Sequence, residues 1–171
     1  MGSGDKEIYG SSINFTGSQP YAPTYHVVAG MLEKDKQNPN IYDPKKGYFH
    51  NPTAIPLRDA IENNQIIFKG EQMTGTMIYV LTEDDEIIIG ERYNPNRNEA
   101  RCPHPTLIGG KNPTVKCVGI MKFDKGKILS ANISSGHYKP NAESLAKMYD
   151  VFRKICETNP DVFHEDFKWR H

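Results

Sequence analysis

Two short segments of the 171-residue sequence carry residue types suited to proton transfer and phosphate binding. The first reads Cys102-Pro103-His104-Pro105-Thr106-Leu107-Ile108-Gly109-Gly110, and the second reads Ser134-Ser135-Gly136-His137-Tyr138-Lys139-Pro140. Imidazole groups titrate near neutral pH, and hydroxyl groups donate hydrogen bonds to phosphate oxygens. His137 could act as a general base or contact a phosphate, and Glu143 could act as a base itself or orient His137. Thr106 could donate a hydrogen bond to phosphate, and His104 could assist.

The second segment leads into an expected helix that begins at Asn141. Free N–H groups and the helix dipole favour an anion at such a position. Gly136 would allow a ligand to approach the backbone closely. We therefore predict a phosphate or pyrophosphate site formed by Ser134, Ser135, Gly136, Tyr138 and Lys139, with Tyr138 able to stack on a base. The alternative is structural, because acids such as Glu143 are common in first helical turns and this loop could be an ordinary cap.

A predicted β-hairpin connects the two segments. Its strands span residues 115–123 and 127–133, and its turn is Asp124-Lys125-Gly126. The first segment enters one strand and the second leaves the other. Since the open ends of an antiparallel hairpin lie side by side, we expect the side chains of His104, Thr106, His137 and Glu143 to converge on one cleft.

The remaining pattern predicts an α+β fold. An antiparallel sheet of two hairpins plus an extra strand is packed by a C-terminal helix and short N-terminal helices. Apolar spacing predicts helices at 24–36, 56–63 and 141–157, a strand at 66–68 and a first hairpin of 76–81 with 86–90. Residues 1–23 are expected to form a flexible arm, with residues 1–4 left over from cloning, and residues 24–171 a single catalytic-type domain.

Composition narrows the classes of function. Lys plus Arg and Asp plus Glu both number 21, so the chain lacks the basic balance of a nucleic-acid binder, although Arg92, Arg97, Arg101 and Lys111 form a local basic stretch. Three cysteines without a Cys-x-x-Cys pair predict no metal site and a reducing compartment, either the cytoplasm or a host cytosol after delivery. The apolar runs are too short for a membrane span, so no membrane partner is expected.

Residues 76–163 resemble a region of plant and fungal IQ-motif calmodulin-binding proteins. The shared pattern is Ile78-Tyr79-Val80-Leu81, Ile88-Ile89-Gly90, His104-Pro105-Thr106-Leu107-Ile108-Gly109, Val118-Gly119, Gly126-Lys127-Ile128, Ser135-Gly136-His137-Tyr138-Lys139-Pro140 and Glu143. Asp43-Pro44, Tyr48 and Asn51 are a fainter trace of it. No IQ motif is recognisable, so calmodulin binding through that motif is not implied.

The Ser-Gly-His-Tyr-x-Pro ending is also similar to that of bacterial polymorphic toxins and effectors. One such group comprises actin-activated, AMP-transferring effectors of Legionella type, whose sites use a serine and a His-x-x-x-Glu pair. Here Glu143 follows His137 by six residues, and Thr106, Ser134 or Ser135 could take the place of the serine. The resemblance implies AMP transfer from ATP, with Mg²⁺, to a protein of a eukaryotic host, with actin as a possible activator.

Three alternatives stay open. ADP-ribosyl transfer from NAD would use the same phosphate site. A metal-independent ribonuclease would need only two histidines and an acid, but the neutral net charge counts against it. A non-catalytic module that binds calmodulin or actin-type proteins would use the two loops for contact.

Overall fold

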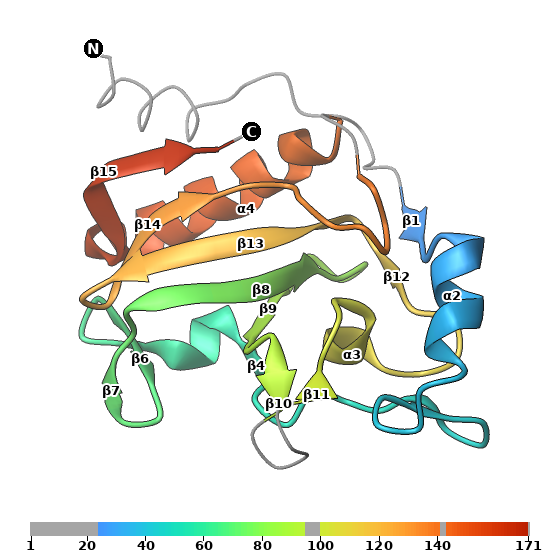
Figure 1. Ribbon diagram of the computed structural model, residues 1–171. Helices are drawn as coiled ribbons and strands as arrows, with labels where there is room; N and C mark the ends of the chain where they lie inside the picture. Colours follow the sequence, from blue (N-terminus) through green and yellow to red (C-terminus); the bar gives the residue numbers. More distant parts are fainter. Residues whose placement is uncertain (1–23, 95–99, 141–142, 171) are drawn as a thin grey trace.

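A six-stranded sheet lies at the centre of the computed structural model, which describes residues 24–94, 100–140 and 143–170 (Figure 1). In spatial order its strands are β15 (Phe163–Trp169), β14 (Lys127–Ala131), β13 (Cys117–Asp124), β8 (Gly75–Leu81), β9 (Ile87–Gly90) and β4 (Ile55–Pro56). Neighbouring strands are antiparallel except β14 and β15, which are parallel. With helices packed on this sheet, the α+β class predicted from the sequence is confirmed.

Both predicted hairpins are present, as β8–β9 and β13–β14. The turn of the second hairpin places Lys125 and Gly126 at φ values of 49° and 82°. Two consecutive positive φ angles match the twist of the flanking strands, and glycine adopts them without steric cost. Strands β8 and β13 pair directly with each other, so the two hairpins form one continuous sheet.

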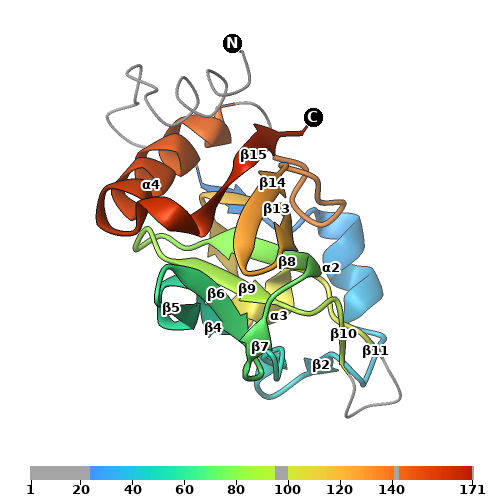
Figure 2. The same ribbon diagram turned by 90° about the vertical axis from the view of Figure 1, so that its left-hand side faces the viewer.

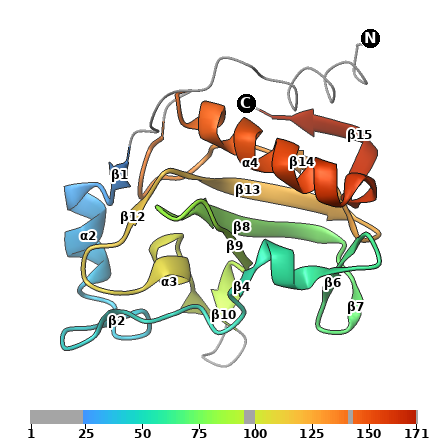
Figure 3. The ribbon, with the colours of Figure 1, turned by 180° about the vertical axis from the view of Figure 1, so that it is seen from behind.

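Helix α4 (Ser144–Thr158) covers one face of the sheet (Figure 3). Its apolar stripe, represented by Met148 and Phe152, packs on Tyr79 and Met121 from the sheet and on Phe167 from β15. The sequence predicted this helix from residue 141 to about 157, but the described helix begins at Ser144. The expected N-cap, Asn141, lies outside the described residues.

Helices α2 (Ala29–Asp35) and α3 (Pro105–Ile108) lie on the opposite side of the sheet from α4 (Figure 2). Helix α3 packs there through Leu107, which shares a second apolar cluster with Ile78, Val80 and Val118. Strand β1 (Tyr25–His26) pairs with β12 (Thr114–Val115), and helix α2 follows it. Because β8 alternates between the two clusters, it is buried on both faces.

Several predicted elements differ in detail from the structure. The helix expected at 24–36 is shorter, because its first residues form β1, and the one at 56–63 is the 3₁₀ turn η1 (Leu57–Ala60). The extra strand at 66–68 exists as β6 (Gln65–Phe68), but the prediction that it extends the main sheet is wrong: it pairs with β5 (Ile61–Glu62) and β7 (Glu71–Gln72). Strand β15, after the turn η2 (Pro160–Val162), was not predicted. The arm predicted for 1–23 lies outside the described residues.

Two small ribbons complete the fold. Strands β2 (Tyr42–Asp43) and β3 (Gly47–Tyr48) pair near α2, and β10 (Tyr93–Asn94) pairs with β11 (Ala100–Arg101) just before α3. Over the part of the chain that the structure describes, no helix is long and apolar enough to cross a membrane.

Candidate functional site

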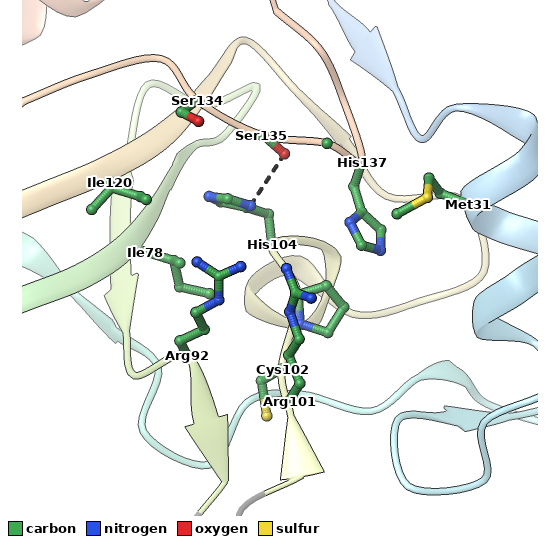
Figure 4. A pocket seen from close by; sticks show the side chains of 12 residues that line it. Met31, Ile78, Arg92, Arg101, Cys102, His104, Ile120, Ser134, Ser135 and His137 are labelled. Carbon is green, nitrogen blue, oxygen red and sulfur yellow. Dashed lines mark hydrogen bonds between the residues drawn. The ribbon is translucent and has the colours of Figure 1, made fainter. Parts of the chain in front are cut away.

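A small pocket of about 100 Å³ lies where two loops meet, residues 102–110 (the first loop) and residues 134–140 (the second loop) (Figure 4). The first loop contributes Cys102, Pro103 and His104, and the second contributes Ser134, Ser135, Gly136 and His137. The remaining lining residues are Ile78 and Ile120 from the sheet, Met31 from α2, and Arg92 and Arg101 from the β10–β11 ribbon. The predicted convergence is therefore confirmed for His104 and His137 and is wrong for Thr106 and Glu143, which do not line the pocket. A cavity of this volume has room for a few water-sized groups, so it can hold a group the size of a phosphate.

His104 stands at the start of α3 with both ring nitrogens engaged. Its Nε2 lies 2.8 Å from the carbonyl oxygen of Gly119, and its Nδ1 lies 3.1 Å from Oγ of Ser135. A carbonyl can only accept, so Nε2 carries the proton and Nδ1 is left with a lone pair. Ser135 therefore donates its hydroxyl proton to Nδ1 of His104. This is the arrangement of a serine nucleophile beside its base.

The environment of His104 keeps its ring neutral. Burial lowers the pKa of His104 from 6.5 to about 4, and coulombic interactions with His137, Arg92 and Arg101 act in the same direction. The hydrogen bond to Gly119 opposes this change but does not overcome it. At neutral pH the imidazole is therefore an acceptor, as Ser135 requires. An anion bound near the ring would offset the surrounding positive charge and help His104 to take up a proton.

The loop that carries Ser135 is anchored by Asn132. The side-chain oxygen of Asn132 accepts the backbone N–H groups of Ile120, at 2.9 Å, and Ser134, at 3.0 Å. Its backbone carbonyl accepts the hydroxyl of Tyr79 at 2.7 Å. These bonds tie the chain to the end of the sheet immediately before Ser135. The position of the serine hydroxyl is thus set by rigid elements and not by the loop alone.

His137 forms the second polar pair of the site. Its Nε2 lies 2.6 Å from Oδ2 of Asp35, the last residue of α2. The same oxygen accepts the hydroxyl of Tyr48 at 3.3 Å. Burial and the nearby Asp35 raise the pKa of Tyr48, so this phenol stays protonated and remains a donor. Figure 4 shows one ring nitrogen of His137 on the side of His104 and Arg101, and the other on the side of α2.

Two guanidinium groups supply positive charge to the pocket. Arg92 and Arg101 come from the two sides of the β10–β11 ribbon, and Figure 4 shows both groups pointing toward the two imidazole rings. The sulfur of Cys102 points away from the rings. Arginine binds phosphate oxygens with paired N–H donors, so the pocket is suited to an anion. Within residues 24–94, 100–140 and 143–170, no group of three or more His, Cys, Asp or Glu side chains could hold a metal ion.

Five of the nine residues predicted for the site line this pocket. These are His104, Ser134, Ser135, Gly136 and His137. Gly136 is exposed, and a Cβ atom there would meet nothing within 4 Å, so its place in the pocket wall is open to a ligand.

The other four predicted residues lie elsewhere. The hydroxyl of Thr106 is buried and donates to the carbonyl of Pro103, and that of Tyr138 is buried and donates to the carbonyl of Pro113. Lys139 is exposed at a φ of 46°, in the turn that follows the site. Glu143 is exposed at the N-cap of α4. None of the four lines the pocket.

Some residues of the site gave a weak signal or none in the sequence. Arg92 and Arg101 belong to the local basic stretch, but nothing in the sequence indicated that they point into a pocket. Asp35 lies 102 residues before His137, and no motif or periodicity connects the two positions. Tyr48 was visible only as part of a faint family pattern. Comparison with protein-family models, with curated proteins and with solved structures finds no match for this chain.

Proposed function

We propose that this domain is an enzyme that transfers the AMP group of ATP to a protein. The observation that carries the proposal is the pair of Ser135 and neutral His104, bonded at 3.1 Å beside two guanidinium groups. A hydroxyl nucleophile with its base, next to a positively charged pocket of phosphate size, suits attack on a phosphorus atom. The resemblance to AMP-transferring effectors supports the choice of ATP as donor.

The proposed reaction has two balanced steps. Oγ of Ser135 attacks the α-phosphorus of ATP, the bond to pyrophosphate breaks, and the serine proton passes to Nδ1 of His104. A hydroxyl of the protein acceptor then attacks the same phosphorus, its proton passes to His137, and the bond to Ser135 breaks. The serine oxygen recovers its proton from His104, and His137 releases the proton of the acceptor to water, which restores both imidazoles. Arg92 and Arg101 neutralise charge on the phosphate in both steps, and Mg²⁺ enters with the phosphates of ATP.

Labelled nucleotides test this proposal directly. The domain would be incubated with ATP labelled at the α-phosphate, with ATP labelled at the γ-phosphate and with labelled NAD, each with and without a eukaryotic cell lysate and purified actin. We expect label from the α-phosphate alone on a lysate protein, and an AMP adduct on Ser135 in intact mass spectra when no acceptor is present. Transfer from NAD would replace the proposal by ADP-ribosylation, and no transfer under any condition would reject it.

A ribonuclease is the second candidate, and one observation favours it. Two imidazole rings flank one pocket together with arginine side chains, as cleavage of a phosphodiester by general acid–base catalysis requires. Against it, the formal net charge of zero lacks the excess of basic residues that favours binding to RNA. Incubation with total RNA separates the candidates, because the nucleotidyltransferase leaves RNA intact.

The biological setting follows from the same resemblance. We propose that the acceptor is a protein of a eukaryotic host, that actin can serve as activator, and that the domain works in a reducing cytosol. The three described cysteines, Cys102, Cys117 and Cys156, form no disulfide, which is compatible with such a compartment.

A further inference from the structure

Helix α2 buries one residue, and that residue is a carboxylate. Among positions 29–35 only Asp35 is buried, with 8% of its surface exposed. Aspartate is almost never buried without a partner, and two-turn helices are usually held by apolar side chains. Asp35 instead reaches His137 across 102 residues of sequence. A buried pair of carboxylate and imidazole seldom adds more stability than apolar packing would, so this contact needs another explanation.

The geometry around Asp35 fixes the orientation of its carboxylate. Oδ2 accepts hydrogen bonds from both His137 Nε2 and the Tyr48 hydroxyl. Tyr48 is 2% exposed, and its backbone N–H donates to the carbonyl of Gly110 at 2.9 Å. The backbone of His137 is held as well, because its carbonyl accepts the N–H of Val28 at 2.7 Å, just before α2. Both partners of the pair are therefore held in place.

We infer that Asp35 is a positioning residue that sets the tautomer of His137. A carboxylate can only accept, so it keeps the proton on Nε2 and leaves the lone pair on Nδ1, the nitrogen that Figure 4 shows on the pocket side. His137 can then take the proton of the acceptor hydroxyl in the second step. This role rests on the proposed AMP transfer, and it divides the work between the two imidazoles: His104 serves Ser135, and His137 serves the acceptor.

The groups facing His137 agree with this division. Asp35 lies on the α2 side with Tyr48 behind it, while His104, Arg92 and Arg101 lie on the pocket side. Only the α2 side offers a negative charge among these groups. A proton taken up by His137 is therefore stabilised through Asp35, without a carboxylate in the pocket that would repel an incoming phosphate.

The test replaces Asp35 by Asn and reads the tautomer and the kinetics separately. The Asn amide can donate to Nε2, so the proton of His137 should move to Nδ1. We expect ¹⁵N NMR of histidine-labelled protein to show His137 protonated at Nε2 in the wild type and at Nδ1 in Asp35→Asn. AMP transfer should fall by about 10²–10⁴-fold in kcat while KM for ATP changes less than about threefold. An unchanged tautomer together with unchanged kcat would overturn the inference.

Tyr48→Phe is the second variant, and it guards against a folding defect. It keeps the carboxylate and removes one of its two donors, so the Nε2 tautomer should persist while kcat falls less than about tenfold. A Tyr48→Phe enzyme as slow as Asp35→Asn would show that packing and not the carboxylate matters, and would also reject the role. The NMR result needs no substrate. If His137 is protonated at Nε2 in the wild type and at Nδ1 in Asp35→Asn, but neither protein transfers AMP, only the proposed reaction is contradicted.

Discussion

The carbonyl of Gly119 accepts the Nε2–H of His104 at 2.8 Å, and this bond decides which nitrogen of His104 faces Ser135. Gly119 lies in strand β13, the central neighbour of both β8 and β14. A central strand of the sheet therefore sets the tautomer of His104. The second imidazole is set in the same way by a different acceptor, the carboxylate of Asp35.

Replacing Ser135 by Ala tests the nucleophile. We expect AMP transfer to fall by more than about 10³-fold, because the variant lacks the oxygen that attacks phosphorus in the proposed reaction. The melting temperature should change by less than about 2 °C, since Ser135 is partly exposed. Ser134→Ala is the matched control, because Ser134 also lines the pocket but is exposed and has no bond to His104 among those described. Equal loss in both variants would point to a loop effect.

Gly119→Ala tests the close approach of β13 to the chain after β14. A Cβ atom at Gly119 would lie 1.8 Å from the carbonyl oxygen of Asn132 and 2.7 Å from its carbon, and both are backbone atoms that cannot move aside alone. We expect urea unfolding to show a loss of at least about 2 kcal/mol. Gly30→Ala in α2 is the control: nothing lies within 4 Å there, and alanine should stabilise the helix by up to about 1 kcal/mol.

His104 predicts a pH dependence of stability. Its pKa in the folded protein is about 4, below its ordinary value of 6.5, so the unfolded chain binds a proton at higher pH than the folded one. The contribution to stability is complete above pH 6.5 and is lost as the pH falls from 6.5 to 4. A tenfold difference in proton affinity between the two states corresponds to about 1.4 kcal/mol, so the loss is on the order of 3 kcal/mol.

The measurement compares urea unfolding at about pH 7 and about pH 4.5. Stability should fall more over this range in the wild type than in His104→Gln, because glutamine does not titrate. His26→Gln, an exposed histidine in β1, should behave as the wild type does. The same pH slope in all three proteins would contradict the buried, neutral state of His104.

The parts of the fold set by local signals were predictable from the sequence. The turn Asp124-Lys125-Gly126 carries residues that tolerate positive φ, and β-branched residues surround it, so the hairpin and the meeting of its two loops followed. Strand β15 was missed because its pairing with β14 is irregular: Ile128 pairs with Phe163 and Ser130 with Lys168, so three extra residues interrupt the alternation.

The sequence could predict where the site lies, but it could predict only some of the residues that form it. His104, Ser135 and His137 lie at the ends of one hairpin, which sequence spacing can reveal. The bond from Asp35 depends on how α2 docks, and docking depends on long-range packing that has no local signature. Thr106 and Tyr138 satisfy backbone carbonyls under the site, which their residue types alone could not distinguish from ligand contacts.

Removing either pocket arginine should weaken the binding of ATP. Arg92→Ala and Arg101→Ala each delete a guanidinium group that lines the pocket. A hydrogen bond from a charged donor to a phosphate would contribute about 1.5–3 kcal/mol. We expect KM for ATP to rise at least about tenfold. Arg170→Ala removes the same charge from an exposed position outside the pocket and should leave KM unchanged. Equal effects of all three variants would mean that net charge, and not the pocket, attracts the nucleotide.

Glu143→Gln decides which acid serves His137. The sequence assigned this role to Glu143, but its side chain is exposed at the N-cap of α4 and does not line the pocket, whereas Asp35 is bonded to the imidazole at 2.6 Å. We therefore expect Glu143→Gln to transfer AMP within about threefold of the wild-type rate and to lose at most about 1 kcal/mol of stability from the helix dipole. Single-turnover rates of Glu143→Gln and Asp35→Asn, measured side by side, give the comparison. If Glu143→Gln were the slower enzyme, Glu143 would be the carboxylate that serves His137. The hydrogen bond between Asp35 and His137 would then only hold α2 against the second loop.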